Sequence, residues 1–271
     1  MPGTLYIVAT PIGNLADASP RSIEVLRAAD LVACEDTRTS RTLLARHGIA
    51  TPVVALHAHN EAIRSKKLLE MLLQGKSIAL VSDAGTPGVS DPGALLVAAA
   101  HREGLRVVPV PGPSAAIAAW SASGFAADRF QFIGFMPGTK DEDLDELEVP
   151  WPVILYEAPH RVRATLRRLL ERFGPERELL IARELTKKFE EVARMKLGEA
   201  PAWLEGAHRE QGEFVLVLGP GAAKSPALSA GHRIMKILLQ KLPAGEAASL
   251  AAKITGLPRN ALYKSSLKGP K

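Results

Sequence analysis

The first 110 residues alternate between short apolar runs and segments with helical spacing, and this alternation most constrains the fold. Apolar runs at 4–10, 31–34, 53–56, 77–81 and 105–110 predict buried strands, and the segments between them predict helices. A helix then joins each pair of successive strands, which is the connection that parallel strands require. The sequence therefore predicts a parallel α/β sheet in this half of the chain.

Polar residues gather where three of these predicted strands end, at Glu35–Arg38, His57–Glu61 and Val81–Gly93. The carboxyl ends of parallel strands share one edge of a sheet, so these clusters are expected to converge where ligands bind. The longest of them holds three glycines, two prolines and two aspartates. Glycine lets a ligand approach the backbone, and aspartate can bind a hydroxyl or an amine. An ordinary loop favours the same residues, so both interpretations remain open.

A helix is expected directly after this loop, over Ala94–Ala100. Asp91 is expected to be its N-cap and Pro92 its first residue, because both residue types are favoured at those positions.

The second half of the chain predicts a more mixed α/β unit. Arg129–Phe135 has the pattern of an antiparallel-type strand, and Trp151–Glu157 predicts another strand, followed by a basic amphipathic helix. Between the two strands, Asp141–Glu148 is acidic and is interpreted as a helical stretch with a solvated face. Glu190–Leu197 and Glu213–Leu218 predict further strands, with a helix between them.

The end of the chain differs from the rest in charge. Residues 224–271 carry seven Lys and two Arg against one acid, a net charge of +8, which leaves −3 for the remainder. Helices are expected at about 231–242, 245–255 and 259–268, and the turn at Gly256–Pro258 fits a helix-turn-helix-like module. Such a module suggests a polyanionic partner, although a solubilising tail has the same composition. The predicted organisation is an α/β domain at 1–111, a second α/β domain at 112–222 and a basic helical module at 223–271.

Composition narrows the class of protein. The chain has 271 residues, 46% of them hydrophobic and 23% charged, as in a globular protein with a sizeable core. No apolar run approaches a membrane span and no signal peptide is evident, so a cytoplasmic location is expected. Cys34 is the single cysteine and is expected in the core. His57 and His59 lack a third ligand at metal spacing, so no metal is expected, and the glycine-rich loops of dinucleotide and P-loop proteins do not occur.

Eight stretches stand out in order along the chain: Val8–Leu15, Glu35–Arg38, His59–Glu61, Val81–Gly93, Pro109–Ser114, Tyr156–Arg161, Ala182–Lys187 and Gly212–Val215. Together they resemble one family, the ribosomal RNA small-subunit methyltransferase I family, whose members are ribose 2′-O-methyltransferases within the tetrapyrrole methylase superfamily. The resemblance implies two α/β/α domains with S-adenosyl-L-methionine in the cleft between them, and a homodimer. It also implies methylation of a cytidine 2′-hydroxyl in the decoding region of 16S rRNA, with the rRNA or the 30S subunit as partner.

The resemblance also implies which residues bind the cofactor. They belong to the loop after the fourth predicted strand, the start of the following small-residue helix, the end of the Trp151–Glu157 strand and the end of the first strand. Ser114 by itself could equally be a helix N-cap, and Pro11 a plain turn residue. The implied residues are Pro11, Asp83, Ala84, Gly85, Thr86, Pro87, Ser114, Ala115, Tyr156 and Glu157.

A ribose hydroxyl is a poor nucleophile, so a general base is expected near the transferred methyl group. Spacing leaves four carboxylates as candidates, Glu35, Asp36, Glu157 and Glu184, with His59 and Lys187 as weaker ones. The basic residues within the same motifs are expected to contact RNA phosphates: Arg38, Arg161, Arg183 and Lys187.

One segment departs from the family pattern. A basic segment is expected after Met136–Pro137, but the acidic Asp141–Glu148 follows, so this segment cannot contact RNA in the same way. Two other functions are considered. A methyltransferase of the same fold could act on a small tetrapyrrole, although such a substrate needs no polybasic module. A non-enzymatic nucleic-acid-binding regulator could use the C-terminal module alone.

Overall fold

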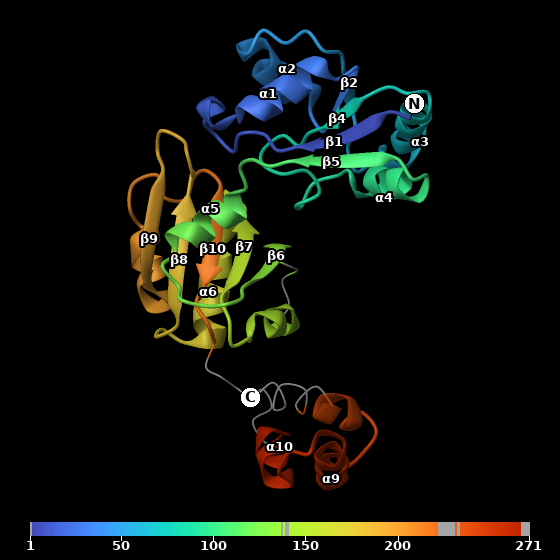
Figure 1. The fold of residues 1–271 in the computed structure, drawn as a ribbon. Coiled ribbons are helices and arrows are strands. Elements are labelled where there is room, and N and C mark those ends of the chain that lie inside the picture. The colour runs from blue at the N-terminus through green and yellow to red at the C-terminus, as the bar shows by residue number, and fades with distance from the viewer. Residues whose placement is uncertain (1, 137, 139–140, 222–230, 232–233, 267–271) are drawn as a thin grey trace.

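The protein, described here from a computed structural model, forms two separate sheets followed by a helical module (Figure 1). The structure describes residues 2–136, 138, 141–221, 231 and 234–266. Each sheet has five strands and carries helices on both faces. The predicted pair of α/β/α regions is confirmed.

The first sheet is entirely parallel, as the alternation of strands and helices predicts. Its strand order is β3-β2-β4-β1-β5. Helices cover both faces, so most of these strands have continuous apolar sequences rather than alternating ones. The strands are β1 (Thr4–Val8), β2 (Leu31–Cys34), β3 (Val53–Ala55), β4 (Ile78–Leu80) and β5 (Arg106–Val110).

Two pairs of helices enclose this sheet. Helices α1 (Pro20–Ala28) and α2 (Thr37–Arg46) pack leucines against one face, and α3 (Glu61–Leu73) and α4 (Ala94–Arg102) pack leucines and alanine against the other. Cys34 is fully buried in the first of these cores, as predicted. Both faces are packed mainly with apolar side chains.

The second sheet is mixed, with strand order β6-β7-β10-β8-β9. Strand β6 runs parallel to β7, and the other neighbours are antiparallel. The antiparallel prediction for the first of these strands is wrong, because the connection to β7 crosses a face of the sheet and returns the chain in the same direction. The strands are β6 (Gln131–Phe135), β7 (Val153–Glu157), β8 (Glu178–Arg183), β9 (Glu191–Lys196) and β10 (Phe214–Leu218).

The acidic connection between β6 and β7 is part of the core, contrary to the predicted solvated face. It forms a 3-10 helix, η2 (Asp141–Leu147), in which Leu144 and Leu147 are 1% and 0% exposed. They join the core cluster beneath the long helix α6 (Pro159–Phe173), together with η3 (Leu197–Glu199) and α7 (Ala200–Leu204). Helix α5 (Ala115–Ala122) packs on the opposite face.

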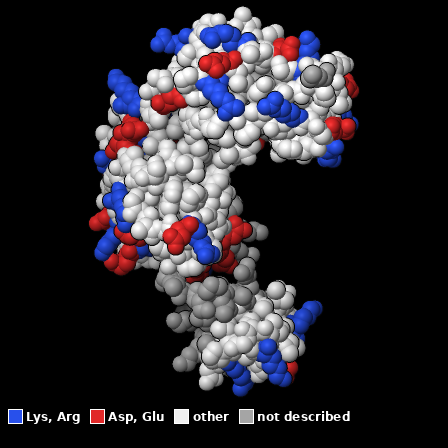
Figure 2. All heavy atoms as spheres, in the orientation of Figure 1, with Lys and Arg blue, Asp and Glu red and all other residues white. Residues whose placement is uncertain are grey.

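A third core belongs to the C-terminal module. Helices α9 (Ala244–Thr255) and α10 (Arg259–Ser266) pack around alanines and Leu262, and Gly256 ends α9 at φ +70°, a left-handed conformation that favours glycine. Lys and Arg are the main charged side chains of this module on the face seen in Figure 2. Residues 222–230 of the predicted linker lie outside the described part of the chain, and the boundaries at 111 and 222 stay predictions. Among the described helices, none is long and apolar enough to cross a membrane.

Candidate active site between the two sheets

The loop after β4 is fixed at its start by hydrogen bonds to the end of β1. Thr10 and Gly85 exchange two backbone hydrogen bonds, of 2.8 and 3.1 Å, and Gly85 adopts φ +84°. The hydroxyl of Thr86 donates to the carbonyl of Pro113 at 3.0 Å, in the segment that leads into α5. The loop is therefore tied both to its own sheet and to the entry of the second region.

The other end of the loop is held by a side chain from α3. One carboxylate oxygen of Glu61 accepts from the backbone N–H groups of Gly93 and Leu95, both at 2.9 Å. Gly93 is the N-cap of α4, at φ +128°, and a Cβ there would lie 2.6 Å from Leu80 Cδ2. The prediction of Asp91 as N-cap is wrong, because Glu61 satisfies these donors from another helix. The Asp91 side chain is thus not used by the helix.

A cavity of about 390 Å³ lies between the two regions. The first region contributes the loop after β4, and the second contributes the start of α5, the ends of β6 and β7 and the start of β10. Of the ten residues predicted to bind the cofactor, eight line this cavity. The lining residues are Ile12, Asp83, Ala84, Gly85, Thr86, Val89, Ser90, Asp91, Ser114, Ala115, Phe135, Tyr156, Glu157, Ala158, Pro159, Glu213, Phe214 and Val215.

The other two predicted cofactor residues lie outside the lining of this cavity. Pro11 lines an adjacent hollow that shares Asp83 with it, and Pro87 belongs to neither. The aromatic part of the cavity wall is built by the second region. The Tyr156 ring makes edge contacts with Phe132 and Phe135, with centroids 5.0 and 5.7 Å apart. A flat ring and a cation could both find partners here, at the aromatic wall and at the carboxylates.

Glu157 is a structural carboxylate. Its side chain is buried and accepts from the Ala158 N–H at 2.9 Å and from the Thr165 hydroxyl at 2.5 Å. The Nε of Arg161 lies 3.3 Å from the same carboxylate, and that guanidinium also donates to the carbonyl of Met136 at 2.7 Å. These partners occupy both oxygens, so Glu157 is excluded as the general base.

Two more candidates follow β2. Asp36 caps α2 and binds Arg38, and hydrogen bonds from the Arg38 side chain and backbone lower its pKa to about 2. A carboxyl of that acidity is a weak proton acceptor, so the prediction of Asp36 as base is not supported. Burial, followed by the nearby charge of Asp83, raises the pKa of Glu35. Glu35 remains a candidate by its chemistry, although it does not line the cavity.

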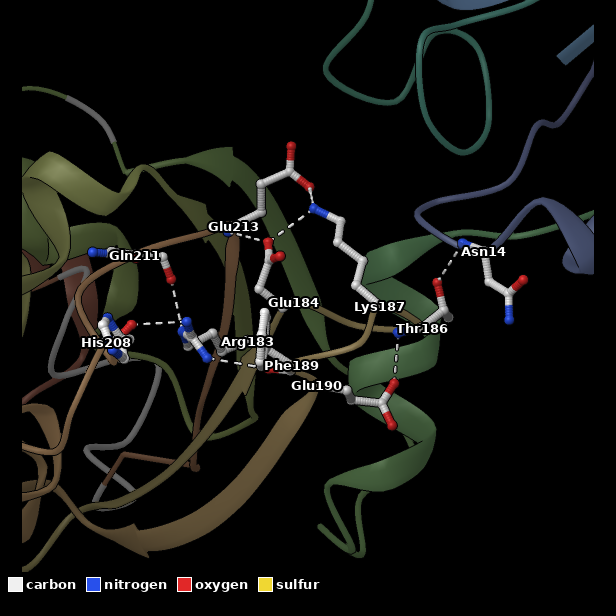
Figure 3. A network of polar contacts seen from close by, with 10 residues as sticks. All are labelled: Asn14, Arg183, Glu184, Thr186, Lys187, Phe189, Glu190, His208, Gln211 and Glu213. Atoms are coloured by element: carbon white, nitrogen blue, oxygen red, sulfur yellow. Dashed lines mark hydrogen bonds and ion pairs between the residues drawn. The ribbon is translucent and has the colours of Figure 1, made fainter. Parts of the chain in front are cut away.

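Glu184 belongs to a network at the entrance of the second region (Figure 3). Lys187 Nζ donates to Glu184 Oε1 and to Glu213 Oε2, both at 2.8 Å, and the Glu213 N–H donates to Glu184 at 3.0 Å. Burial acts to raise the pKa of Glu184, but these hydrogen bonds outweigh it and the pKa is lowered. Glu184 is therefore a poor base, and its role here is to hold Lys187.

The structure corrects the prediction that Arg183 contacts RNA. Its side chain is 5% exposed, and its guanidinium donates to the carbonyls of Gln211, His208 and Phe189 at 2.7, 2.8 and 3.1 Å (Figure 3). It also binds Glu191 at 3.2 Å. These partners engage its donors, so Arg183 fastens loops of the second region. Arg38 is 88% exposed and Arg161 is 39% exposed, and both are already paired with carboxylates.

A second hollow lies where the loop after β8 contacts the first region. The Asn14 N–H donates to Thr186 Oγ1 at 3.0 Å (Figure 3), and Asn14 also caps the short helix η1 (Leu15–Asp17). Thr186 and Glu184 adopt left-handed backbone conformations, at φ +66° and +49°. The hollow is lined by Gly13, Asn14, Leu15, Ala16, Arg46, His47, Thr186, Lys187 and Lys188. Four of these residues, Arg46, His47, Lys187 and Lys188, have basic side chains, and we call this depression the basic hollow.

Asp91 is the cavity residue whose role the sequence does not reveal. It lies beside the predicted cofactor residues, but its position before a helix led to the wrong interpretation. Burial, and then the charges of Glu35 and Asp83, raise its pKa to about 6. The useful sequence signal is that Ser-Asp-x-Gly occurs twice in the loop, at residues 82–85 and 90–93, with Asp83 and Asp91 in the same place.

Comparison with known proteins first defines a class. The model of the family described as Tetrapyrrole (Corrin/Porphyrin) Methylases matches residues 4–201, and that of the RsmI C-terminal HTH domain matches residues 226–268. Uroporphyrin-III C-methyltransferase from Thermus thermophilus, solved in complex with S-adenosylhomocysteine, has the same fold. Its TM-score is 0.59 at 19% identity, over 80% of this chain and 97% of that chain.

Curated relatives then define the family more closely. Ribosomal RNA small subunit methyltransferase I of Xylella fastidiosa is 48% identical over 97% of this chain and 98% of the relative. The protein of the same name from Mesorhizobium japonicum is 47% identical over 97% of this chain and 91% of its own length. The chain belongs to the tetrapyrrole methylase family and, within it, to the ribosomal RNA small subunit methyltransferase I family.

Proposed function

We propose that this protein is an S-adenosylmethionine-dependent methyltransferase that methylates the 2′-hydroxyl of a cytidine in the decoding region of 16S rRNA. One observation carries the proposal: eight of the ten residues that the family resemblance assigns to the cofactor line the cavity between the two α/β/α regions. The chain matches relatives named for small-subunit rRNA methylation along nearly its whole length. We further propose a homodimer located in the cytoplasm.

The cavity has the size and chemistry to hold the methyl donor. About 390 Å³ is within the range of small-molecule pockets, and its walls are largely apolar. Tyr156, Phe135 and Val215 would contact the adenosine, and Ser114 and the loop backbone would hold its polar groups. Asp83 would bind a hydroxyl or the amino group. When bound, S-adenosylmethionine supplies a methyl group on a positively charged sulfur.

The residues of this chain contribute alignment and electrostatics. Two walls from different regions hold donor and acceptor together, and such positioning can supply much of the rate enhancement. Asp83 and Asp91, the two carboxylates of the loop after β4, lie in a partly desolvated site, where they would interact strongly with the positive charge of the donor.

The basic hollow suits an RNA backbone. It shares Leu15 with the hollow that contains Pro11, which in turn shares Asp83 with the cavity. A strand of nucleic acid could follow these depressions, with a ribose at the cavity and a neighbouring phosphate at Arg46 and Lys188. Phosphate contacts position the substrate without reading its sequence. A tetrapyrrole substrate, the alternative function, would need neither the hollow nor the basic module.

The test combines donor binding with product mapping. Purified protein should bind S-adenosylmethionine in calorimetry, and it should methylate one cytidine ribose in 30S subunits lacking this modification, located by mass spectrometry of nuclease digests. Arg46→Glu should lower kcat/KM for the ribosomal substrate about tenfold at low salt and leave donor affinity unchanged. Lys67→Glu, the same charge change at an exposed position of α3, should have little effect.

Two results would end the proposal. A protein without affinity for the donor would not be a methyltransferase of this type. A protein that binds the donor, methylates no rRNA and methylates a tetrapyrrole equally well after removal of residues 224–271 would favour the small-molecule alternative.

A further inference from the structure

Four carboxylates line the cavity, and they differ in how their charges are compensated. Glu157 is held by Arg161, Thr165 and a backbone N–H. Glu213 is paired with Lys187 at 2.8 Å. These two carboxylates are therefore each paired with a cation of the second region.

The other two carboxylates come from the loop after β4. Asp83 Oδ1 accepts from the backbone N–H of Asp36 at 2.9 Å, and its charge acts on Arg38. A hydrogen bond from the Ser82 hydroxyl is the one interaction that lowers the pKa of Asp91, and no cation is among the groups that act on it. The Ser82 hydroxyl is itself directed to the carbonyl of Gly85 at 3.0 Å. Asp91 is thus the least compensated carboxylate of the cavity.

The backbone keeps Asp91 facing the cavity. The preceding Ser90 has φ +67°, a conformation that non-glycine residues rarely adopt without a structural reason. Two residues later, the carboxylate of Glu61 fixes the backbone at Gly93. A side chain between two such fixed points loses little freedom when it is oriented toward a substrate.

Asp91 and Tyr156 face the cavity from opposite regions. The charge of Asp91 contributes to the raised pKa of the Tyr156 hydroxyl, for which burial is the main cause. The titratable groups that act on Asp91 are Glu35 after β2, Asp83 after β4 and Tyr156 of β7. A ribose placed between the two regions would therefore be in reach of Asp91 at the loop and of Tyr156 at the wall.

We propose that Asp91 is the general base that accepts the proton of the ribose 2′-hydroxyl during methyl transfer. This rests on the proposed function. The hydroxyl oxygen forms a bond to the methyl carbon while the carbon–sulfur bond breaks, and its electron pair remains on sulfur. The hydroxyl proton moves to a carboxylate oxygen of Asp91. The products are the 2′-O-methyl ribose, S-adenosylhomocysteine and a protonated Asp91, which later releases its proton to water.

The electrostatics of the site suit this role. A base works best when its pKa lies near the working pH, and burial together with Glu35 and Asp83 raises the pKa of Asp91 to about 6. Above that pH the carboxylate is ionised and ready, yet more basic than an ordinary aspartate.

The test is the pH dependence of Asp91→Asn with 30S subunits as substrate. The wild-type protein should lose activity about tenfold per pH unit below about pH 6. The variant should have a kcat at least about 100-fold lower, and its activity should not show this decrease at acidic pH. Asp91→Glu, which keeps a carboxylate, should recover part of the rate. Asp128→Asn, a matched change on an exposed loop, should behave as wild type.

Two readouts do not depend on turnover. Carbon-detected NMR of carboxyl groups should show a resonance titrating near pH 6 that is missing from Asp91→Asn. Calorimetry should show S-adenosylhomocysteine affinity within about threefold of wild type. Undiminished kcat in Asp91→Asn would overturn the proposal, and so would loss of donor binding, which would make Asp91 a cofactor ligand. Inactivity of the wild-type protein itself would instead contradict the proposed function.

Discussion

The two regions differ in how the charged groups that they bring to the site are compensated. Two carboxylates from the first region, Glu35 and Asp91, have pKa values raised chiefly by burial and by neighbouring carboxylates. Charged groups from the second region are paired, as in the buried Glu157 and Arg183. The difference indicates that the first region retains reactive groups, whereas the second provides a rigid wall. Unpaired buried charge costs stability, so its presence in one region is informative about function.

The largest expected effect comes from removing a paired charge of the second region. Arg183→Met should lower the free energy of unfolding by about 3 kcal/mol, because Glu191 and three carbonyls lose their buried donor. Urea denaturation followed by circular dichroism measures this. Arg167→Met, at an exposed ion pair of α6, serves as control and should change little. Equal effects of the two would show that the buried network does not stabilise this region.

A smaller loss of stability is expected when the contact that fixes the end of the loop after β4 is removed. Glu61→Ala removes the acceptor of two backbone N–H groups at the start of α4, and should cost about 1.5 kcal/mol, as loss of a helix cap does. The loop should also shift, so kcat should fall more than donor affinity. Glu70→Ala, exposed on the same helix, provides the comparison. Unchanged kcat in Glu61→Ala would show that this anchor does not position Asp91.

The smallest effect has the opposite sign. Asp91 has a pKa of about 6 in the folded protein against 3.8 as the ordinary value, so the folded state holds this proton more tightly than the unfolded state. Stability therefore falls as pH rises from about 4 to 6, and the penalty persists above pH 6. Asp91→Asn should stabilise the protein at pH 8 by about 1 kcal/mol, after discounting for solvent screening, and by little at pH 3.5. Thermal unfolding at the two pH values measures this difference, and a destabilised variant at pH 8 would contradict the comparison.

The fold of the first region follows closely from its sequence. Apolar runs separated by helical segments favour parallel pairing, because each helix carries the chain back to the start of the next strand. Ser19 caps the start of α1, and Gly75 follows the end of α3 at φ +92°. The second region was less predictable, because local pattern does not state strand direction. In η2, two leucines among acids are enough to bury one face, which composition alone concealed.

By itself, the sequence determined the family, the two α/β/α regions and eight of the eighteen residues that line the cavity. Only the tertiary structure decided which charged groups are available for chemistry. The motifs around Arg183, Glu157 and Glu184 do not show whether these charges are paired, because their partners come from other segments of the chain. Asp91 likewise could be separated from a helix cap only once Glu61 was seen to occupy that role. The reason is physical: ionisation depends on the surrounding dielectric and charges, which the fold assembles across the chain.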